Sequence, residues 1–182
     1  MIDVERRAEL LARMGALERE LRHLERELET MDGAPLLAAG PFDLLLCRVD
    51  TELVGFVETE VERVVQAAEL LPIADAPPWV LGLLNLRGTL LPIVSIEARV
   101  GRSRAEIASS DSYVIANVEG RRTGVLVQDT LGMRSVAGGS VQSPSHRGVM
   151  ANFVIGLVPD DEGLVSILSV ERLMSSVEPT TE

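Results

Sequence analysis

Few side chains in this sequence have the types and spacings that catalysis requires. The two histidines, His23 and His146, lie far apart, and neither has a second histidine or a cysteine at metal-ligand spacing. Cys47, the only cysteine, lies between Leu46 and Arg48 in an apolar run, where a small buried side chain is more usual than a nucleophile. The sequence contains no G-x-S-x-G, Walker-type or G-x-G-x-x-G motif. We therefore expect no enzymatic activity, no metal site and no cofactor.

The acidic cluster Asp160, Asp161 and Glu162 lies between two apolar runs and is followed by Gly163. Such a cluster is typical of the solvent-exposed tip of a hairpin. Calcium binding is the alternative interpretation. No carboxylate pair lies in an apolar setting that would prepare one member as a general acid.

The most unusual polar residues lie inside the most hydrophobic run, WVLGLLNLRGTLLPI (79–93), which contains Asn85, Arg87 and Gly88. Burying an unpaired charge is costly, so Arg87 must reach water, a partner or an acid of the same chain. Asn85 is short enough to bind nearby backbone and fix a turn, and Gly88 supplies the freedom for a sharp exit into the next strand.

Composition limits the class of protein. A chain of 182 residues fits one compact domain, or one domain with an added segment, and 46% hydrophobic but only 3% aromatic residues predict an aliphatic core. The net charge of −11 opposes nucleic-acid binding, which needs a basic face. No apolar stretch is long enough for membrane insertion, and the charged N-terminus does not resemble a secretory signal. With one cysteine, a cytoplasmic location is expected.

Residues 1–31 predict an amphipathic helix with a heptad seam. The seam residues, spaced alternately by four and three, are Leu10, Met14, Leu17, Leu21, Leu24, Leu28 and Met31. The seam is strict enough to predict an intermolecular coiled coil and hence a homodimer; docking of the helix on its own domain is the alternative. Residues 32–41, rich in glycine and proline, predict a linker.

From residue 42 onward the chain consists of short runs of valine, isoleucine and leucine separated by turn signals. Without long intervening helices, such runs predict a small barrel or sandwich and not a parallel doubly wound sheet. ERLMSS (171–176) predicts a short closing helix, and residues 176–182 a flexible tail.

The segment APPWVLGLLNLRGTLLPI resembles the signature of the CheW chemotaxis coupling proteins. The matching residues are Pro77, Pro78, Gly82, Asn85, Leu86, Arg87, Gly88 and Pro92. Leu71-Pro72, GRRTGVLVQDTL (120–131), Ile155-Gly156 and the ILSVERLM ending extend the resemblance over residues 42–175. It implies a mainly β fold of two five-stranded SH3-like barrels that share an apolar seam. It also implies a non-enzymatic scaffold that bridges a chemoreceptor's helical tip and the regulatory domain of a histidine kinase.

The resemblance also implies roles for individual residues. Val61, Arg63, Leu86 and Arg87 are expected to contact partners. Gly82, Asn85, Gly88, Pro92 and Gly156 are expected to shape the turns and strands of the motif. Two roles remain open for Arg87. It contacts a receptor, or it pairs with an acid of the same chain and holds the two barrels in register.

Five positions depart from the family pattern; one is Glu97, where the family commonly has an arginine, and the other four lack a family acid. Arg63 stands where the family commonly places a glutamate near the motif arginine, and Ser95, Gln128 and Ser169 stand where it commonly has aspartates. Either Arg87 has lost its acidic neighbour, or Glu62 or Glu60 replaces it. Serine can still cap a helix, so the fold is expected to survive. These changes suggest a divergent coupling protein. The alternative is a coiled-coil structural or regulatory protein that kept the fold, lost receptor coupling, and binds partners through the N-terminal helix.

Overall fold

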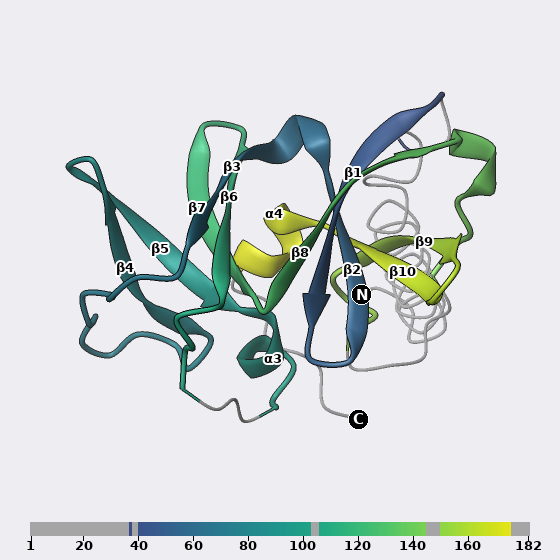
Figure 1. Ribbon diagram of the computed structural model, residues 1–182. Helices are drawn as coiled ribbons and strands as arrows, with labels where there is room; N and C mark the ends of the chain where they lie inside the picture. The colour runs from purple at the N-terminus through teal and green to yellow at the C-terminus, as the bar shows by residue number, and fades with distance from the viewer. Residues whose placement is uncertain (1–36, 38–39, 103–105, 145–149, 176–182) are drawn as a thin grey trace, which may run out of the picture.

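The computed structural model describes residue 37 and residues 40–102, 106–144 and 150–175, which form two five-stranded sheets, each curled into a small barrel (Figure 1). Barrel 1 contains β1 (Phe42–Val49), β2 (Glu52–Val57), β8 (Asp129–Val136), β9 (Val154–Asp160) and β10 (Gly163–Leu168). Barrel 2 contains β3 (Val61–Gln66), β4 (Val80–Leu86), β5 (Thr89–Ser95), β6 (Ser112–Val118) and β7 (Arg121–Val127). The short helical elements are η1 (Glu58–Glu60), α3 (Ile96–Arg99), η2 (Gly138–Ser140) and α4 (Val170–Met174). The predicted mainly β fold of two barrels is confirmed.

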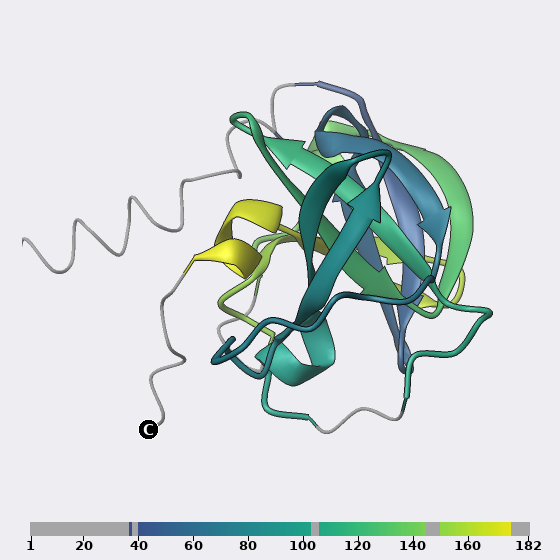
Figure 2. The ribbon, with the colours of Figure 1, turned by 90° about the vertical axis from the view of Figure 1, so that its left-hand side faces the viewer.

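Barrel 1 is discontinuous in sequence. The chain forms β1 and β2, passes through η1 into all five strands of barrel 2, and returns to complete barrel 1 with β8, β9 and β10. In the turned view, the strands of barrel 2 lie in front of those of barrel 1 (Figure 2). The apolar runs alone predicted the strands but not this division between the barrels.

The two barrels are built on the same plan. Their strand orders, β8-β1-β2-β10-β9 and β3-β6-β7-β5-β4, match position by position, and each contains one parallel pair, β2 with β10 and β5 with β7. Ile93 pairs with Gly82 and Gly124, and Ile167 pairs with Gly156 and Gly55. Residues of β9 and β10 therefore correspond to residues of β4 and β5 that lie 74 positions earlier.

Aliphatic side chains fill three clusters. One cluster is shared between the barrels and includes Cys47, Val54 and Phe56 from barrel 1 with Val114 and Val125 from barrel 2. Each barrel also has a cluster of its own. The shared cluster is the predicted apolar seam, and it joins the two barrels into one hydrophobic core.

Leu37 belongs to the core of barrel 1, although it comes from the stretch predicted as a linker. Its side chain is 2% exposed and packs among Leu44, Val136 and Ile155. The heptad seam lies outside the described residues, so the N-terminal helix stays a prediction. Within the described ranges, no helix is long and apolar enough to cross a membrane.

Ser95 and Ser169, two of the positions expected to depart from the family pattern, lie at the N-terminal ends of α3 and α4. Ser95 Oγ accepts a hydrogen bond from the backbone N–H of Ala98 (3.1 Å), and Ser169 Oγ accepts one from that of Arg172 (3.2 Å). The two serines are counterparts, 74 positions apart, and both act as helix N-caps. Serine at these two positions therefore satisfies the local helix geometry.

Candidate functional site

The β4–β5 turn carries the motif arginine. Leu86 pairs with Thr89, so the turn residues are Arg87 and Gly88, with φ angles of 53° and 88°. Two consecutive positive φ angles define a type I′ turn, which suits the right-handed twist of the flanking strands. Asn85 Oδ1 accepts a hydrogen bond from the backbone N–H of Gly88 (2.8 Å). The turn is thus fixed by local contacts and presents Arg87 at its tip.

Arg87 is exposed and makes no ion pair with any carboxylate in the described part of the chain. Leu86 packs partly against the core of barrel 2, and Leu90 is 51% exposed. The internal-clamp interpretation of Arg87 therefore finds no support in this arrangement. The turn offers a cation beside exposed aliphatic surface.

Gly82 and Pro92 hold the strands of this hairpin in place. A Cβ atom at Gly82, which has φ +150°, would lie 2.7 Å from the carbonyl oxygen of Leu71. Pro92 pairs with Leu83, and its carbonyl accepts a hydrogen bond from Thr123 Oγ1 (3.0 Å). The counterpart Gly156 of barrel 1 approaches Val141, where an added Cβ would lie 2.6 Å from Cγ1.

A β-bulge separates Val61 from Arg63, because the register between β3 and β6 shifts there and leaves Glu62 as the extra residue. Arg122 donates from Nε and Nη2 to both carboxylate oxygens of Glu62 (2.6 and 2.7 Å), and Arg63 Nη2 lies 3.1 Å from Glu62 Oε1. The hydrogen bond from Arg122 holds the pKa of Glu62 below its ordinary value. Glu62 therefore pairs with Arg122 and Arg63, and it does not take the place of the acid that the sequence resemblance led us to expect beside Arg87.

Glu60 does not replace that acid either. Its Oε2 atom is buried without a hydrogen-bond partner, and burial, followed by the nearby charge of Glu171, raises the pKa of its carboxyl. Neither of the two acids considered from the sequence thus pairs with Arg87.

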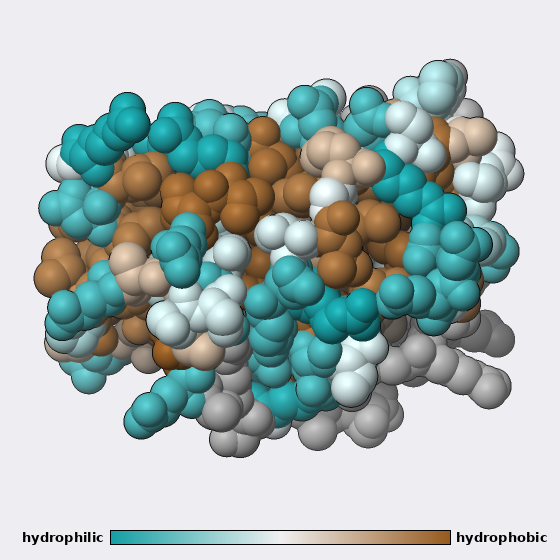
Figure 3. Space-filling model, in the orientation of Figure 1, coloured by the Kyte–Doolittle hydropathy of each residue, from teal (hydrophilic) through white to brown (hydrophobic). Residues whose placement is uncertain are grey.

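The expected partner-contact residues lie at one end of barrel 2. β5 and β7 are parallel and in register, so the β4–β5 and β6–β7 turns share an end of the barrel. Val61 pairs with Ala116, close to the β6–β7 turn, and therefore lies toward the same end. This end, which we call the hairpin end of barrel 2, carries Arg87, Leu90 and Arg121. The face shown in Figure 3 carries hydrophobic side chains over both barrels.

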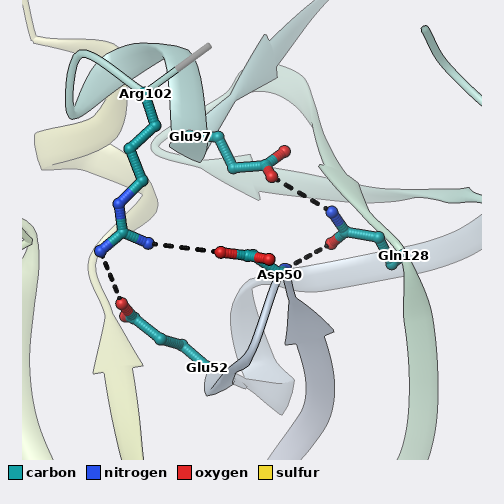
Figure 4. Close-up of polar contacts among 5 residues, drawn as sticks. All are labelled: Asp50, Glu52, Glu97, Arg102 and Gln128. Carbon is teal, nitrogen blue, oxygen red and sulfur yellow. Dashed lines mark hydrogen bonds and ion pairs between the residues drawn. The ribbon is translucent and has the colours of Figure 1, made fainter. Parts of the chain in front are cut away.

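A polar network that sequence reasoning missed crosses between the barrels (Figure 4). Gln128 donates from Nε2 to Glu97 Oε1 (3.3 Å) and accepts from the backbone N–H of Asp50 at Oε1 (3.0 Å). Arg102 binds Glu52 (2.9 Å) and lies 3.8 Å from Asp50. An amide at position 128 can both donate and accept, so it can join an acid of barrel 2 to backbone of barrel 1.

The described thiol and the possible metal-binding side chains show no arrangement for catalysis. Burial raises the pKa of the Cys47 thiol to about 12, and the charge of Asp129 acts in the same direction, so the reactive thiolate is scarce. Within the described residues, no three His, Cys, Asp or Glu side chains form a group that could hold a metal ion. His23 and His146 lie outside those residues. The described residues offer surfaces for binding, and no catalytic group is assembled among them.

Two barrels with a shared core and an exposed arginine at a turn are suited to a small binding scaffold. A family model described as a CheW-like domain matches residues 43–178, so the chain belongs to the CheW-like domain family. Proteins of this family are non-enzymatic scaffolds, and the chain is accordingly a scaffold protein of the chemotaxis type and not an enzyme.

Individual relatives agree with this assignment. The chain is 30% identical over 143 residues to "Chemotaxis protein CheW" of Treponema pallidum, covering 75% of this chain and 84% of the relative. It is 26% identical over 157 residues to "Protein FrzA" of Myxococcus xanthus, covering 80% and 93%. The crystal structure of the scaffolding protein TtCheW from Thermoanaerobacter tengcongensis has the same fold, with a TM-score of 0.70, 21% identity, and coverage of 76% of this chain and 91% of that chain.

Proposed function

We propose that this protein couples a chemoreceptor-type sensor to the regulatory domain of a histidine kinase, at receptor arrays on the cytoplasmic face of a membrane. Membership of the CheW-like family and the chemotaxis names of the relatives support this role. The observation that carries it is the state of Arg87: a rigid type I′ turn exposes its guanidinium without a carboxylate partner among the described residues.

The charge around Arg87 indicates what the partner supplies. Arg63 occupies the position of the expected acid, and Glu62 is bound by Arg122. Among the described residues, therefore, no acidic side chain neutralises Arg87, so the matching surface of the sensor is proposed to present a carboxylate beside apolar residues. Charge pairs of this kind contribute to specificity and to the rate of association.

Calorimetric titration with the regulatory domain of a histidine kinase, and separately with a peptide of a receptor tip, tests the proposal. The variant Arg87→Asn is preferred to alanine, because asparagine tolerates the positive φ of this turn. We expect Arg87→Asn to weaken binding to the receptor peptide about tenfold, as loss of an interfacial charge pair does. Glu69→Gln, an exposed acid beyond the opposite end of β3, is the control.

A form lacking residues 1–31 separates this proposal from the alternative in which the N-terminal helix binds partners. The deletion must keep Leu37, because that side chain is part of the core of barrel 1. Retained binding by the shortened form would place partner binding on the barrels. Loss of all binding by a shortened form that is still folded would contradict the proposal and favour the helix.

A further inference from the structure

Two exposed apolar side chains border the hydrophobic cluster that the barrels share. Val64 of β3 pairs with Val114 of β6, and Met133 of β8 pairs with Leu45 of β1. Val114 and Leu45 belong to the shared cluster, and directly paired residues of neighbouring strands point to the same face of a sheet. Val64 and Met133 therefore extend the cluster to the surface, where they are 38% and 54% exposed.

The two residues occupy equivalent places in the common plan of the barrels. Leu45 of β1 corresponds to Val114 of β6, because the β1–β2 and β6–β7 hairpins have matching registers. Val64 and Met133, their partners on the edge strands β3 and β8, are thus counterparts, one on each barrel. Leu131, 43% exposed, adds to the apolar surface on β8. We call Val64, Leu131 and Met133 the core-edge surface.

Positive charge borders the core-edge surface on barrel 2. Arg63 directly precedes Val64 and is exposed. Its carboxylate contact among the described residues is Glu62, which also accepts two hydrogen bonds from Arg122. Two guanidinium groups thus share one carboxylate. A ligand that matches this surface has an apolar stripe with acids beside it.

The sequence of residues 10–31, which lie outside the described residues, has this pattern. In the predicted helix, the leucines and methionines of the heptad seam form the apolar stripe. From residue 18 onward, each of the positions directly flanking the seam is a glutamate, namely Glu18, Glu20, Glu25 and Glu27. The arginines of the same stretch, Arg19, Arg22 and Arg26, fall on the opposite side of the helix.

These flanking charges do not favour pairing with a second copy of the helix. In a parallel coiled coil, Arg13 of one copy would face Glu18 of the other, but Glu20 would face Glu25, which is repulsive. The same glutamates are complementary in charge to the arginines beside the core-edge surface. Charge therefore supports docking of the helix on its own chain over the coiled coil.

The connection to the barrels is short enough to favour this contact. Leu37 is buried in barrel 1 and anchors the chain there. The residues from Met31 to Leu37 span up to about 20 Å when extended, and a helix over residues 10–31 is about 33 Å long. A segment held by such a short tether has an effective concentration on the order of mM at nearby surfaces.

We propose that the helix predicted for residues 10–31 packs its seam on the core-edge surface of its own chain, with its flanking glutamates paired to arginines of barrel 2, Arg63 first among them. This contact covers the strand that carries Val61 and Arg63, the residues expected to contact partners. The helix thus acts as an internal competitor of the sensor. The competition rests on the proposed coupling function, whereas the docking does not.

Thiol labelling of cysteine reporters in the full-length protein tests the docking. Val64→Cys and Met133→Cys report on the core-edge surface, and Leu164→Cys, whose parent side chain is 52% exposed beside the β9–β10 turn, is the matched control. Native Cys47 contributes little labelling, because burial raises the pKa of its thiol to about 12.

Disrupting the seam should uncover the reporters. The pair Leu21→Asp and Leu24→Asp places charges in the apolar stripe, so labelling at positions 64 and 133 should accelerate about fivefold or more, with no change at position 164. Protection by the protein's own helix does not depend on protein concentration, whereas protection by the helix of a second copy rises with it. Labelling at about 1 and about 50 μM separates the two.

Neutralising the flanking glutamates gives results of opposite sign for the two arrangements. Replacing all four by glutamine removes attraction to the arginines of barrel 2, so labelling at positions 64 and 133 should accelerate. In a paired coil the same change removes repulsion and would strengthen self-association, which sedimentation velocity measures. Arg63→Glu should also accelerate labelling at position 133. Replacing Arg19, Arg22 and Arg26 by glutamine is the matched control and should leave labelling unchanged.

Three results would overturn the docking: reporters that label equally fast with the seam intact and disrupted, protection that rises with concentration, or full protection in the variant without the glutamates. Affinity for the receptor-tip peptide is measured separately and should rise about fivefold when the seam is disrupted. Protected reporters without peptide binding in either form would reject the coupling function and keep the docking. Peptide binding of equal strength in both forms, with unprotected reporters, would do the reverse.

Discussion

The guanidinium of Arg99 lies over the indole of Trp79, with the Arg99 Cζ atom 4.3 Å from the ring centroid. The same guanidinium lies 5.4 Å from the ring of Phe153 and donates a hydrogen bond to the backbone carbonyl of Ser175. Trp79 immediately precedes β4 and Arg99 ends α3, which follows β5, whereas Phe153 immediately precedes β9 and Ser175 follows α4. Through these contacts, one buried arginine links the segments beside β4 and β5 to the segments beside β9 and α4.

Replacing Arg99 should loosen this junction. Arg99→Met keeps most of the apolar volume but loses the cation–π contact and the hydrogen bond. We expect the free energy of unfolding to fall by about 2 kcal/mol. Urea denaturation followed by far-UV circular dichroism measures the change, with Arg121→Met, at an exposed position in β7, as the comparison. An effect of Arg99→Met no larger than that comparison would show that the stacking contributes nothing to stability.

Titration of Glu62 makes the stability of the fold depend on pH in a direction that its contacts determine. Its pKa in the folded protein is held below the ordinary value of 4.5, first by the hydrogen bond from Arg122. A carboxyl with a lowered folded pKa contributes stability above its unfolded pKa and loses it as pH falls through the folded value. We therefore expect its NMR titration midpoint to lie below 4.5 and Arg122→Gln to move it upward. A midpoint unaffected by Arg122→Gln would reject this pairing in solution.

Ionisation of Glu60 affects the free energy of unfolding in the opposite direction from ionisation of Glu62. Burial, with the charge of Glu171 as the second cause, raises its folded pKa, so the ionised form costs stability above that pKa, and the cost disappears as the group is protonated. Glu60→Gln should stabilise the protein at pH 7 by about 0.5 kcal/mol, a small value because the residue is only partly buried. Thermal denaturation at pH 7 and pH 4 tests this, and the gain should vanish at pH 4. Equal gains at the two pH values would point to a cause other than charge.

Gly82 should tolerate no side chain. Gly82→Ala would place a Cβ 2.7 Å from backbone of Leu71 at a φ of +150°, so the free energy of unfolding should fall by about 3 kcal/mol. Gly156→Ala meets a side chain that can move, Val141, and should cost less. Gly139→Ala, where nothing lies within 4 Å, is the control and should be nearly neutral. Chemical denaturation of the three variants provides the ranking, and Gly156→Ala as damaging as Gly82→Ala would contradict the argument.

Ser169 should be replaceable by an acid but not by alanine. Its hydroxyl caps α4 through the backbone N–H of Arg172, so Ser169→Ala should cost about 1 kcal/mol. Ser169→Asp introduces the residue type that the sequence resemblance leads us to expect here and should match serine, because aspartate caps equally well and favours the helix N-terminus. Denaturation midpoints of the pair measure the difference. Equal losses in both variants would mean that the cap contributes no stability.

The strands and the β4–β5 turn could be predicted from the sequence, because both depend on residues that are neighbours in the chain. Alternating aliphatic runs identified the β region, and Asn85-Leu86-Arg87-Gly88 carried the chemistry of its own turn. The acidic cluster at residues 160–162 predicts a hairpin tip, and Asp161 and Glu162 do form the turn between β9 and β10.

Contacts between distant segments were not predictable in this way. The pairing of Gln128 with Glu97 and Asp50, and the stacking of Arg99 on Trp79, join residues whose neighbours in sequence give no sign of the contact. The bulge at Glu62 changes which face a side chain occupies, and this depends on the register with β6. Leu37 looked like part of a linker because glycine and proline surround it, yet barrel 1 buries it.

The discontinuity of barrel 1 sets an order of events during synthesis. All five strands of barrel 2 have left the ribosome once residue 127 has emerged, whereas β2 must wait for β10, which ends at Leu168. Closing that long loop costs entropy that only the final strands repay. Until then, the β1–β2 hairpin exposes its edges and the apolar faces that later pack in the core. The growing chain is therefore most vulnerable to misassociation in the interval between completion of its second barrel and closure of its first.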